Sequence, residues 1–346
     1  MCPLDKQNNI TWIDPCKGLG IYLVVLGHCN IQPALQHFIY LFHMPLFFFI
    51  SGYLHTTRND LGGYFKRKTI HLLVPYVSFL LLLYPLELGR VFFHHGAGPL
   101  FSAALLAGLW GGARLQGLYG VFWFLPCLFM TQQIMNLLLA RYRTLTVSCV
   151  VILATCLSYF NARLAPQLSL PLDANVVLAA MPLFYLGYLG RAIPERFARL
   201  LAVTGVAGAG LGVYFVYLGM PVFYNMRLGI YGIPGLSLLL AVCCILCLIT
   251  VSRISPAQGV LARLGAASMG IMFIHKQLPV IAPLNNWAVR HGYAASVVFT
   301  ALSLGMTELL RHTVLTRALL LGSEADFHKL EFSTGRIVET HATSGV

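Results

Sequence analysis

The stretch Trp12-Ile-Asp-Pro-Cys-Lys-Gly-Leu-Gly-Ile-Tyr-Leu-Val-Val-Leu-Gly-His-Cys29 decides the fold, because it is apolar enough to enter a bilayer yet carries Asp14, Lys17 and His28. Ionisable side chains inside hydrocarbon cost at least a few kcal/mol each, so they usually face a cavity or a partner. Lys17 and His28 stand eleven residues apart, which on an α-helix is three turns plus roughly 20° and roughly 16 Å along the axis. We therefore expect both side chains to project from one face, at different depths.

The composition around this stretch is that of an integral membrane protein. Of the 346 residues, 58% are hydrophobic and only 10% are charged, against roughly 25% charged residues in soluble domains. The net charge of +12 is spread in short runs between apolar segments, which argues against nucleic acid as a partner. We expect one helical bundle over 1–322 and a polar, disordered cytoplasmic tail over 323–346. Because the first apolar run contains Lys17, we expect a retained span rather than a cleaved signal peptide.

Windows of about twenty apolar residues predict about ten transmembrane helices in a single all-α bundle. The segment 98–110 is apolar but short, which favours a re-entrant or interfacial piece over a full crossing. With this count and a cytoplasmic N-terminus, most Lys and Arg residues of the connections fall on the cytoplasmic side, as the positive-inside rule requires, and both termini are cytoplasmic. The expected spans are 12–30, 37–56, 70–88, 118–140, 145–160, 174–190, 199–218, 230–251, 265–284 and 294–315.

Two of these spans contain helix-breaking residues. Pro45 and Gly52 lie in the run Phe42-His-Met-Pro-Leu-Phe-Phe-Phe-Ile-Ser-Gly-Tyr53, and Pro126 lies in the expected fourth span. Breaks of this kind free backbone groups, which are tolerated at membrane depth only beside protein or water. We therefore expect polar space beside both spans.

Three histidines in the spans are candidates for chemistry. A histidine can take and return a proton near neutral pH, which is what activating a hydroxyl nucleophile requires. For His43 and His275, each taken alone, the favoured interpretation is a neutral imidazole bonded to a neighbouring helix. The functional interpretation is favoured for His28, because Lys17 and Asp14 share its span and burying all three for packing is costly.

The run Tyr64-Phe-Lys-Arg-Lys-Thr-Ile-His-Leu-Leu-Val-Pro-Tyr76 brings cations to the entry of the third span. One interpretation is topology anchoring with contact to lipid headgroups. The other is that Arg67, Lys68 and His71 bind the phosphates of a donor from the cytosol. The cysteines lie mostly in apolar runs without His or carboxylate neighbours, so we expect packing roles and no metal.

Taken together, these motifs resemble the membrane acyltransferase-3 family, and most closely its bacterial sugar O-acetylases similar to fucose 4-O-acetylase. The resemblance rests on Lys17-x10-His28, the run from Phe42 to Tyr53 and the basic entry into a Leu-Leu-Val-Pro-Tyr span. It extends through Trp123-Phe-Leu-Pro126 to Gly265-Ala-Ala-Ser268 and Ile274-His275, similar to a late Gly-x-x-Ser…His stretch.

The resemblance implies a multi-pass enzyme of the bacterial inner membrane that moves an acyl group, commonly acetyl from acetyl-CoA, to a sugar hydroxyl of a lipid-linked or surface glycan such as lipopolysaccharide. The family's Arg/Lys-x10-His motif maps onto Lys17 and His28, with His28 as the candidate base. Asp14 and His43 complete the expected catalytic group, and Trp123, His275 and Glu308 are expected to bind substrate.

The family's Arg-x-x-Arg motif maps onto Lys68 and His71, which is a departure. Lysine lacks the bidentate fork of arginine, and histidine is only partly protonated near neutral pH, so donor binding would depend on Arg67 as well. With the donor on the cytosolic side and His28 in the outer half, we expect a polar tunnel lined by the first three spans and Trp123. The alternative function is a secondary transporter or flippase, with Glu308 and Asp14 as coupling carboxylates.

Overall fold

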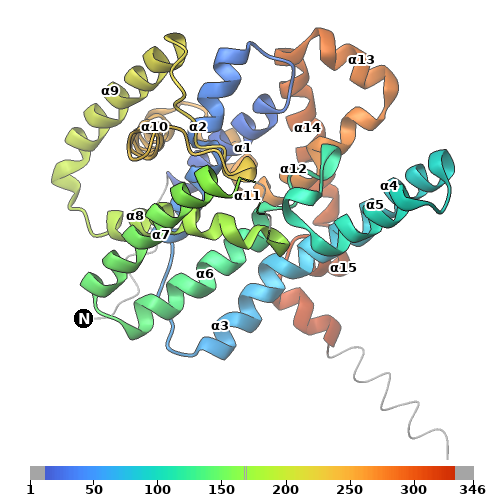
Figure 1. Ribbon diagram of the computed structural model, residues 1–346, viewed down its shortest axis with the longest axis horizontal. Coiled ribbons are helices and arrows are strands. Elements are labelled where there is room, and N and C mark those ends of the chain that lie inside the picture. The colour runs from blue at the N-terminus through green and yellow to red at the C-terminus, as the bar shows by residue number, and fades with distance from the viewer. Residues whose placement is uncertain (1–11, 167, 169, 332–346) are drawn as a thin grey trace, which may run out of the picture.

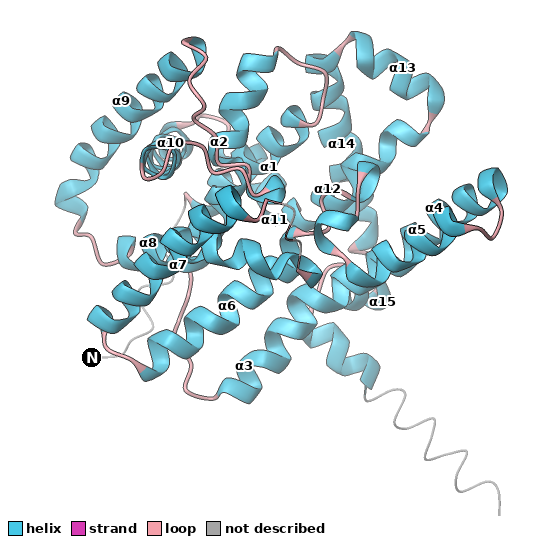
Figure 2. Ribbon diagram, in the orientation of Figure 1, coloured by secondary structure: helices cyan, strands magenta, loops and turns pink. Residues whose placement is uncertain are grey.

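The computed structural model describes residues 12–166, 168 and 170–331, and their regular structure is helical (Figures 1 and 2). Strand-like pairing in these residues is limited to an isolated bridge between Asn225 and Ile230. The helices are α1 (Ile13–Gly27), α2 (Pro33–Tyr53), α3 (Leu61–Lys68), α4 (Val74–His95), α5 (Pro99–Trp110), α6 (Phe124–Arg141), α7 (Thr144–Leu164), α8 (Val177–Gly190), α9 (Ala198–Tyr217), α10 (Leu236–Ile254), α11 (Gln258–Ala266), α12 (Ser268–Ile274), α13 (Ala282–Arg290), α14 (Gly292–Leu310) and α15 (Val314–Leu319).

The expectation of an all-α membrane protein is confirmed. Within the described residues, eight helical segments are long and apolar enough to cross a membrane. The count of ten stays a prediction, because α1 has only 15 residues and the expected ninth span is divided among α11, α12 and a 3₁₀ segment, His275–Val280. The cytoplasmic side of both termini also stays a prediction. The eight segments are Pro33–Tyr53, Leu61–His95, Gly117–Arg141, Thr144–Leu164, Pro171–Gly190, Glu195–Tyr217, Leu236–Ile254 and Gly292–Leu310.

The apolar segment at 98–110 forms α5, a 12-residue helix, and its re-entrant or interfacial position stays a prediction. It folds back beside α4, and the two helices extend from the bundle as an arm (Figure 1). The hydroxyl of Tyr84 on α4 donates a 2.7 Å hydrogen bond to the carbonyl of Ala104 on α5. This pairing keeps α5 against α4.

Helix α1 lies inside the bundle and packs closely on α11. A Cβ added at Gly18 would stand 2.0 Å from the carbonyl oxygen of Leu261, and one added at Gly265 would stand 1.9 Å from that of Asp14. Only glycine permits this backbone approach, as at other small-residue crossings of membrane helices. Because α12 follows α11 directly, the same crossing fixes α12 relative to α1.

The expected breaks at Gly52 and Pro126 are corrected by the structure. Helix α2 runs through Pro45 and Gly52 to Tyr53, and Gly52 instead permits contact with α8, since a Cβ there would lie 1.8 Å from the carbonyl oxygen of Phe184. Pro126 is in the first turn of α6, where a missing N–H breaks no intrahelical bond.

A real interruption occurs where α3 passes into α4. Residues Thr69–Leu73 form a π-helical turn, and Pro75 follows it in the first turn of α4. Proline cannot donate a hydrogen bond to the carbonyl four residues before it, and its ring crowds that carbonyl, which here belongs to His71. The wider turn places His71 at a point of irregular backbone, as π-turns often do at functional sites.

The chain after α14 differs from the expectation of disorder from residue 323. Residues 324–331 are helical, and Arg317 on α15 forms an ion pair with Asp326, at 2.8 Å between Nε and Oδ2. Leu321 and Gly322, which connect the two helices, face α3 and its π-turn. Residues 332–346 of the expected tail lie outside the described residues.

Candidate functional site

Two neighbouring cavities lie along α1. The first, which we call the histidine cavity, has a volume of about 190 Å³ and contains His28, His43 and Trp123. The second, the basic cavity, has a volume of about 520 Å³ and contains Lys17, Arg67, Lys68 and His71. One stripe of α1 contains Lys17, Ile21, Val24 and His28. Lys17, Ile21 and Val24 line the basic cavity, and Val24 and His28 line the histidine cavity. The sequence spacing predicted this shared face.

His28 and His275 form a hydrogen-bonded pair. The distance from Nδ1 of His28 to Nε2 of His275 is 3.0 Å, and the two rings are stacked with centroids 5.1 Å apart. Nδ1 of His275 also lies 2.8 Å from the carbonyl oxygen of Ile271, so it must carry the proton and donate. In the neutral ring Nε2 is then the acceptor, and His28 donates through Nδ1. These partners assign the tautomers and leave Nε2 of His28 with a lone pair.

The end of α1 is held by α2, and this fixes the position of His28. His28 is the C-cap residue of α1 and follows Gly27 directly. The carbonyl of Gly27 accepts hydrogen bonds from Nε2 of Gln36 at 2.7 Å and from the hydroxyl of Tyr40 at 2.9 Å. Carbonyls in the last turn of a helix need such partners. The imidazole therefore projects from a backbone whose neighbouring carbonyl is fully hydrogen-bonded, and His275 is its ring partner.

His43 lies on the α2 side of the same cavity. Its Nδ1 donates to the carbonyl of Ile39 at 2.9 Å, which leaves Nε2 as the acceptor of the neutral ring. The ring of Tyr40 packs against both histidines, with its centroid 5.0 Å from that of His43 and 6.4 Å from that of His28. The cavity thus offers two imidazole acceptors on adjoining helices.

Arg227 supplies a cation to the histidine cavity. One terminal nitrogen donates to the carbonyl of Leu115 at 3.2 Å, whereas the buried Nε has no hydrogen-bond partner among the described residues. Burial lowers the pKa of Arg227, and the charge of Asp173 acts in the opposite direction. The guanidinium rests against Gly120, where a Cβ would meet its carbon at 2.9 Å. A guanidinium that has an N–H donor without a partner and lies in a cavity is able to bind an anionic or carbonyl oxygen.

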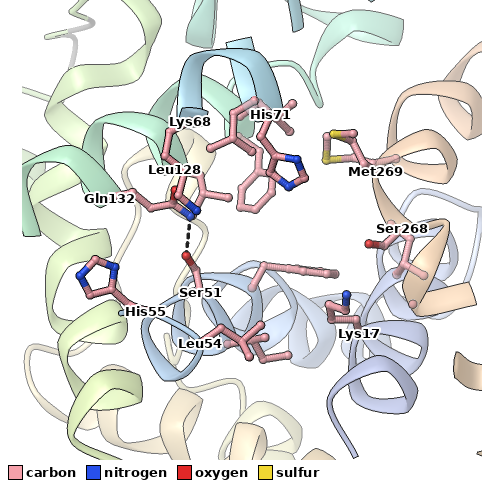
Figure 3. Close-up of a pocket in the computed structure, with 18 of the residues that line it drawn as sticks. Lys17, Ser51, Leu54, His55, Lys68, His71, Leu128, Gln132, Ser268 and Met269 are labelled. Carbon is pink, nitrogen blue, oxygen red and sulfur yellow. Dashed lines mark hydrogen bonds between the residues drawn. The ribbon is translucent and has the colours of Figure 1, made fainter. Parts of the chain in front are cut away.

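The basic cavity gathers cations from three elements (Figure 3). Lys17 comes from α1 and faces His71 across the space. Arg67 and Lys68 come from α3, and the ring of Tyr64 lies 5.8 Å from the guanidinium carbon of the former and 5.5 Å from the ammonium of the latter. Arg58 precedes α3 and is fixed by two backbone hydrogen bonds to the Asn136 side chain, at 2.9 and 3.0 Å. None of the described lining residues is acidic.

Two histidines also line the basic cavity. Burial lowers the pKa of His55 to about 4, and Lys68 and Arg191 act in the same direction, so His55 is neutral at pH 7. Nδ1 of His71 donates to the carbonyl of Gly322 at 3.2 Å, which ties the C-terminal segment to the π-turn. Neither imidazole is needed for the positive charge, because Lys17, Arg58, Arg67 and Lys68 supply it.

Three of the expected site residues lie apart from the His28 imidazole. Lys17 pairs with Asp14 at 2.7 Å and serves the basic cavity. Asp14 is about half exposed and is not among the residues that line either cavity. Glu308 also lies outside both linings and pairs with Arg311 at 2.9 Å. The arrangement therefore joins Lys17 to Arg67, Lys68 and His71, and His28 to His43, His275 and Trp123.

The sequence of residues 10–308 matches the acyltransferase domain of the acyltransferase-3 family. The chain belongs to this family. The match covers every residue that lines the histidine cavity and all those that line the basic cavity except Leu321. The apolar helices of the chain make it a membrane acyltransferase.

Two curated relatives are similar to parts of the acyltransferase. Nodulation protein NolL of Sinorhizobium fredii (strain NBRC 101917 / NGR234) is 33% identical over 139 residues, which are 36% of this chain and 35% of the relative. Nodulation protein NolL of Mesorhizobium japonicum (strain LMG 29417 / CECT 9101 / MAFF 303099) is 30% identical over 106 residues, 26% of this chain and 28% of the relative. The chain thus spans about a third of the length of these relatives. No solved structure matches it.

Sequence reasoning missed three residues that line the two cavities. Arg58 and Arg227 were counted only as connection charges, and Gly120 gave no signal because its role depends on a side chain 107 positions away. Asn136 is one of several polar residues of α6, and polar groups inside an expected span were a signal available in the sequence for such a partner. Across the described ranges, no three His, Cys, Asp or Glu side chains are grouped as metal ligands would be.

Proposed function

We propose that this protein is a membrane O-acetyltransferase that moves an acetyl group from acetyl-CoA to a sugar hydroxyl of a surface or lipid-linked glycan. The observation that carries the proposal is the pairing of His28 with His275, which leaves Nε2 of His28 as a base inside a cavity. Membership of the acyltransferase family supports acyl transfer. The choice of acetyl and of a glycan follows from the resemblance to bacterial sugar O-acetylases.

The basic cavity is the proposed site for the phosphates of CoA. Lys17, Arg67 and Lys68 face one space of about 520 Å³, and charge-assisted hydrogen bonds to phosphate are among the strong ones in proteins. Three cations from two helices suit a polyphosphate better than a single anion. His71 adds one further imidazole nitrogen beside them.

In the proposed reaction, Nε2 of His28 takes the proton of the acceptor hydroxyl while that oxygen attacks the thioester carbonyl carbon. The carbon–sulfur bond then breaks, and the CoA thiolate leaves and receives the proton from the His28 imidazolium. The products are the acetyl ester and free CoA thiol. His275 accepts the hydrogen bond from Nδ1 of His28 throughout and so holds the imidazole in the tautomer that the base needs.

The proposed orientation follows from the distribution of Lys and Arg. The positive-inside rule favours a cytosolic position for Arg67 and Lys68 and hence for the basic cavity. The histidine cavity then lies deeper toward the outer side of a bacterial inner membrane. Acetyl-CoA would enter from the cytosol, and the glycan would approach from the opposite side.

The test is transfer by the purified protein. With acetyl-CoA and an extracted glycan acceptor, the protein is expected to release CoA thiol and to increase the mass of the glycan by one acetyl group. Surface glycan from cells without the gene should lack this mass increase. A transporter or flippase would move solute without consuming acetyl-CoA. Absence of both thiol release and the mass shift from correctly folded protein would exclude the proposed reaction.

A further inference from the structure

The two cavities share part of their boundary. Val24, Met44 and Met272 line the histidine cavity and also line the basic cavity. Side chains that face both spaces must stand between them, and these three come from α1, α2 and α12. We call them the apolar wall. The expected polar tunnel is therefore two cavities divided by apolar side chains.

The residues of the apolar wall are close in sequence to the three histidines. Val24 precedes His28 by four residues on α1, and Met272 precedes His275 by three at the end of α12, so each is about one turn, roughly 5 Å, from its histidine. Met44 follows His43 in α2. The same three helices thus supply both the histidines and the wall.

Two of the three wall residues are methionines, of which Met44 is partly exposed. Val24 is 3% exposed and Met272 is 5% exposed. Methionine is unbranched with three rotatable bonds, so it changes shape with little strain. Phosphates would lose their hydration at such a wall, whereas an uncharged acyl thioester would not. Excluding water there also protects the thioester from hydrolysis.

We propose, on the basis of the proposed function, that the apolar wall is the passage for the acyl thioester and selects the acyl group that is transferred. The CoA phosphates stay in the basic cavity, and the thioester passes between Val24, Met44 and Met272 to reach Nε2 of His28. Beyond the wall, a cavity of about 190 Å³ must hold both the acyl group and the acceptor hydroxyl. A short acyl group is what this space accommodates.

The experiment compares two methionines of one helix. Met272 belongs to the wall, while Met269, one turn earlier on α12, lines only the basic cavity (Figure 3). In full-length protein, Met272→Ala should raise kcat/KM for butyryl-CoA relative to acetyl-CoA at least tenfold, because it widens the passage. Met269→Ala should leave this ratio within threefold, whatever its effect on donor affinity. Equal shifts in the two variants, or no shift in Met272→Ala, would overturn the proposal.

A narrowing variant gives the complementary result. Met272→Phe should lower acetyl transfer at least tenfold while CoA itself, measured by calorimetry, binds within threefold of wild type. Met44→Phe makes the same test if Met272→Phe no longer binds CoA. Transfer within threefold of wild type in a CoA-binding variant would overturn the passage. A wild-type protein that transfers no acyl group at all would instead refute the proposed function, so the two failures are distinguishable.

Discussion

His28 and His275, 247 positions apart in the chain, are joined by a hydrogen bond of 3.0 Å. His275 is itself held by the carbonyl of Ile271, so a backbone oxygen at one end of the chain of bonds determines which nitrogen of His28 is basic. In the proposed reaction His275 is a positioning residue for His28. This differs from the substrate-binding role that the sequence suggested for it, and the two roles predict different kinetics.

Replacing His275 separates positioning from substrate binding. His275→Leu should lower kcat by up to about 10²-fold, since misplacing a reacting group costs that much, with KM for donor and acceptor little changed. His275→Gln should recover part of the loss, because its amide oxygen can accept from Nδ1 of His28. Steady-state kinetics on both variants checks this. A rise in acceptor KM with unchanged kcat would favour direct substrate binding instead.

His28→Ala should abolish transfer, because general-base catalysis is typically worth 10²–10⁴-fold. The matched control is His37→Ala, in which the lost imidazole packs on Phe223 with ring centroids 4.7 Å apart and does not line the histidine cavity. Release of CoA thiol is the measurement, with membrane insertion checked for both variants. If His28→Ala keeps activity within about threefold of wild type, His28 is not the base.

The donor site is tested by removing charge from the basic cavity. Arg67→Gln with Lys68→Gln should raise KM for acetyl-CoA about tenfold or more, with a smaller change in kcat at saturation, because hydrogen bonds to charged groups contribute about 1.5–3 kcal/mol each. Lys66→Gln is the neighbouring control, since Lys66 is exposed and lies outside the cavity lining. An unchanged KM in the folded double variant would support membrane anchoring as the role of these cations.

The sequence predicted which residues share a helix face better than it predicted which helices meet at the site. The spacing of Lys17 and His28 predicted one helical face, and both do lie along one stripe of α1. It did not reveal that the stripe serves two cavities, because the division is made by Met44 and Met272 from other helices. Periodicity describes a helix surface, whereas a cavity depends on which surfaces meet.

The contact between His28 and His275 was beyond sequence reasoning for a similar reason. It depends on the crossing of α1 and α11, where Gly18 and Gly265 permit backbone approach. Glycines are common in membrane helices, so neither one marks a crossing in the sequence. Pro126 was misinterpreted because its effect depends on where the helix begins: inside a helix it would break a hydrogen bond, and in the first turn it breaks none.

Orientation in the membrane is tested by labelling. In a cysteine-depleted variant, a single cysteine at position 68 should react with an impermeant thiol reagent added from the cytosolic face, and one at position 28 should react only from the outer face. The reason is the proposed cytosolic entry of the basic cavity. Labelling of position 28 from the cytosol alone would mean that acetylation precedes movement of the glycan across the membrane.

Arg227 is the remaining charge in the histidine cavity, and we predict that it binds the acceptor. Its buried Nε lacks a hydrogen-bond partner among the described residues, and leaving such a group unpaired costs about 1–3 kcal/mol or more. A ligand oxygen would remove this cost. Arg227→Gln should therefore raise KM for the glycan about tenfold or more without changing KM for acetyl-CoA. Arg227→Lys should recover little, because lysine lacks the planar fork.

Gly120→Ala tests the same point without removing the charge. Its Cβ would stand 2.9–3.1 Å from the guanidinium carbon and terminal nitrogens of Arg227, closer than ordinary van der Waals contact, so the guanidinium must move. The variant should raise KM for the glycan in the same direction as Arg227→Gln and by a smaller factor. Combining the two substitutions should add little, since residues that act through one contact are not additive. Fully additive effects would show that Gly120 acts on the reaction independently of Arg227.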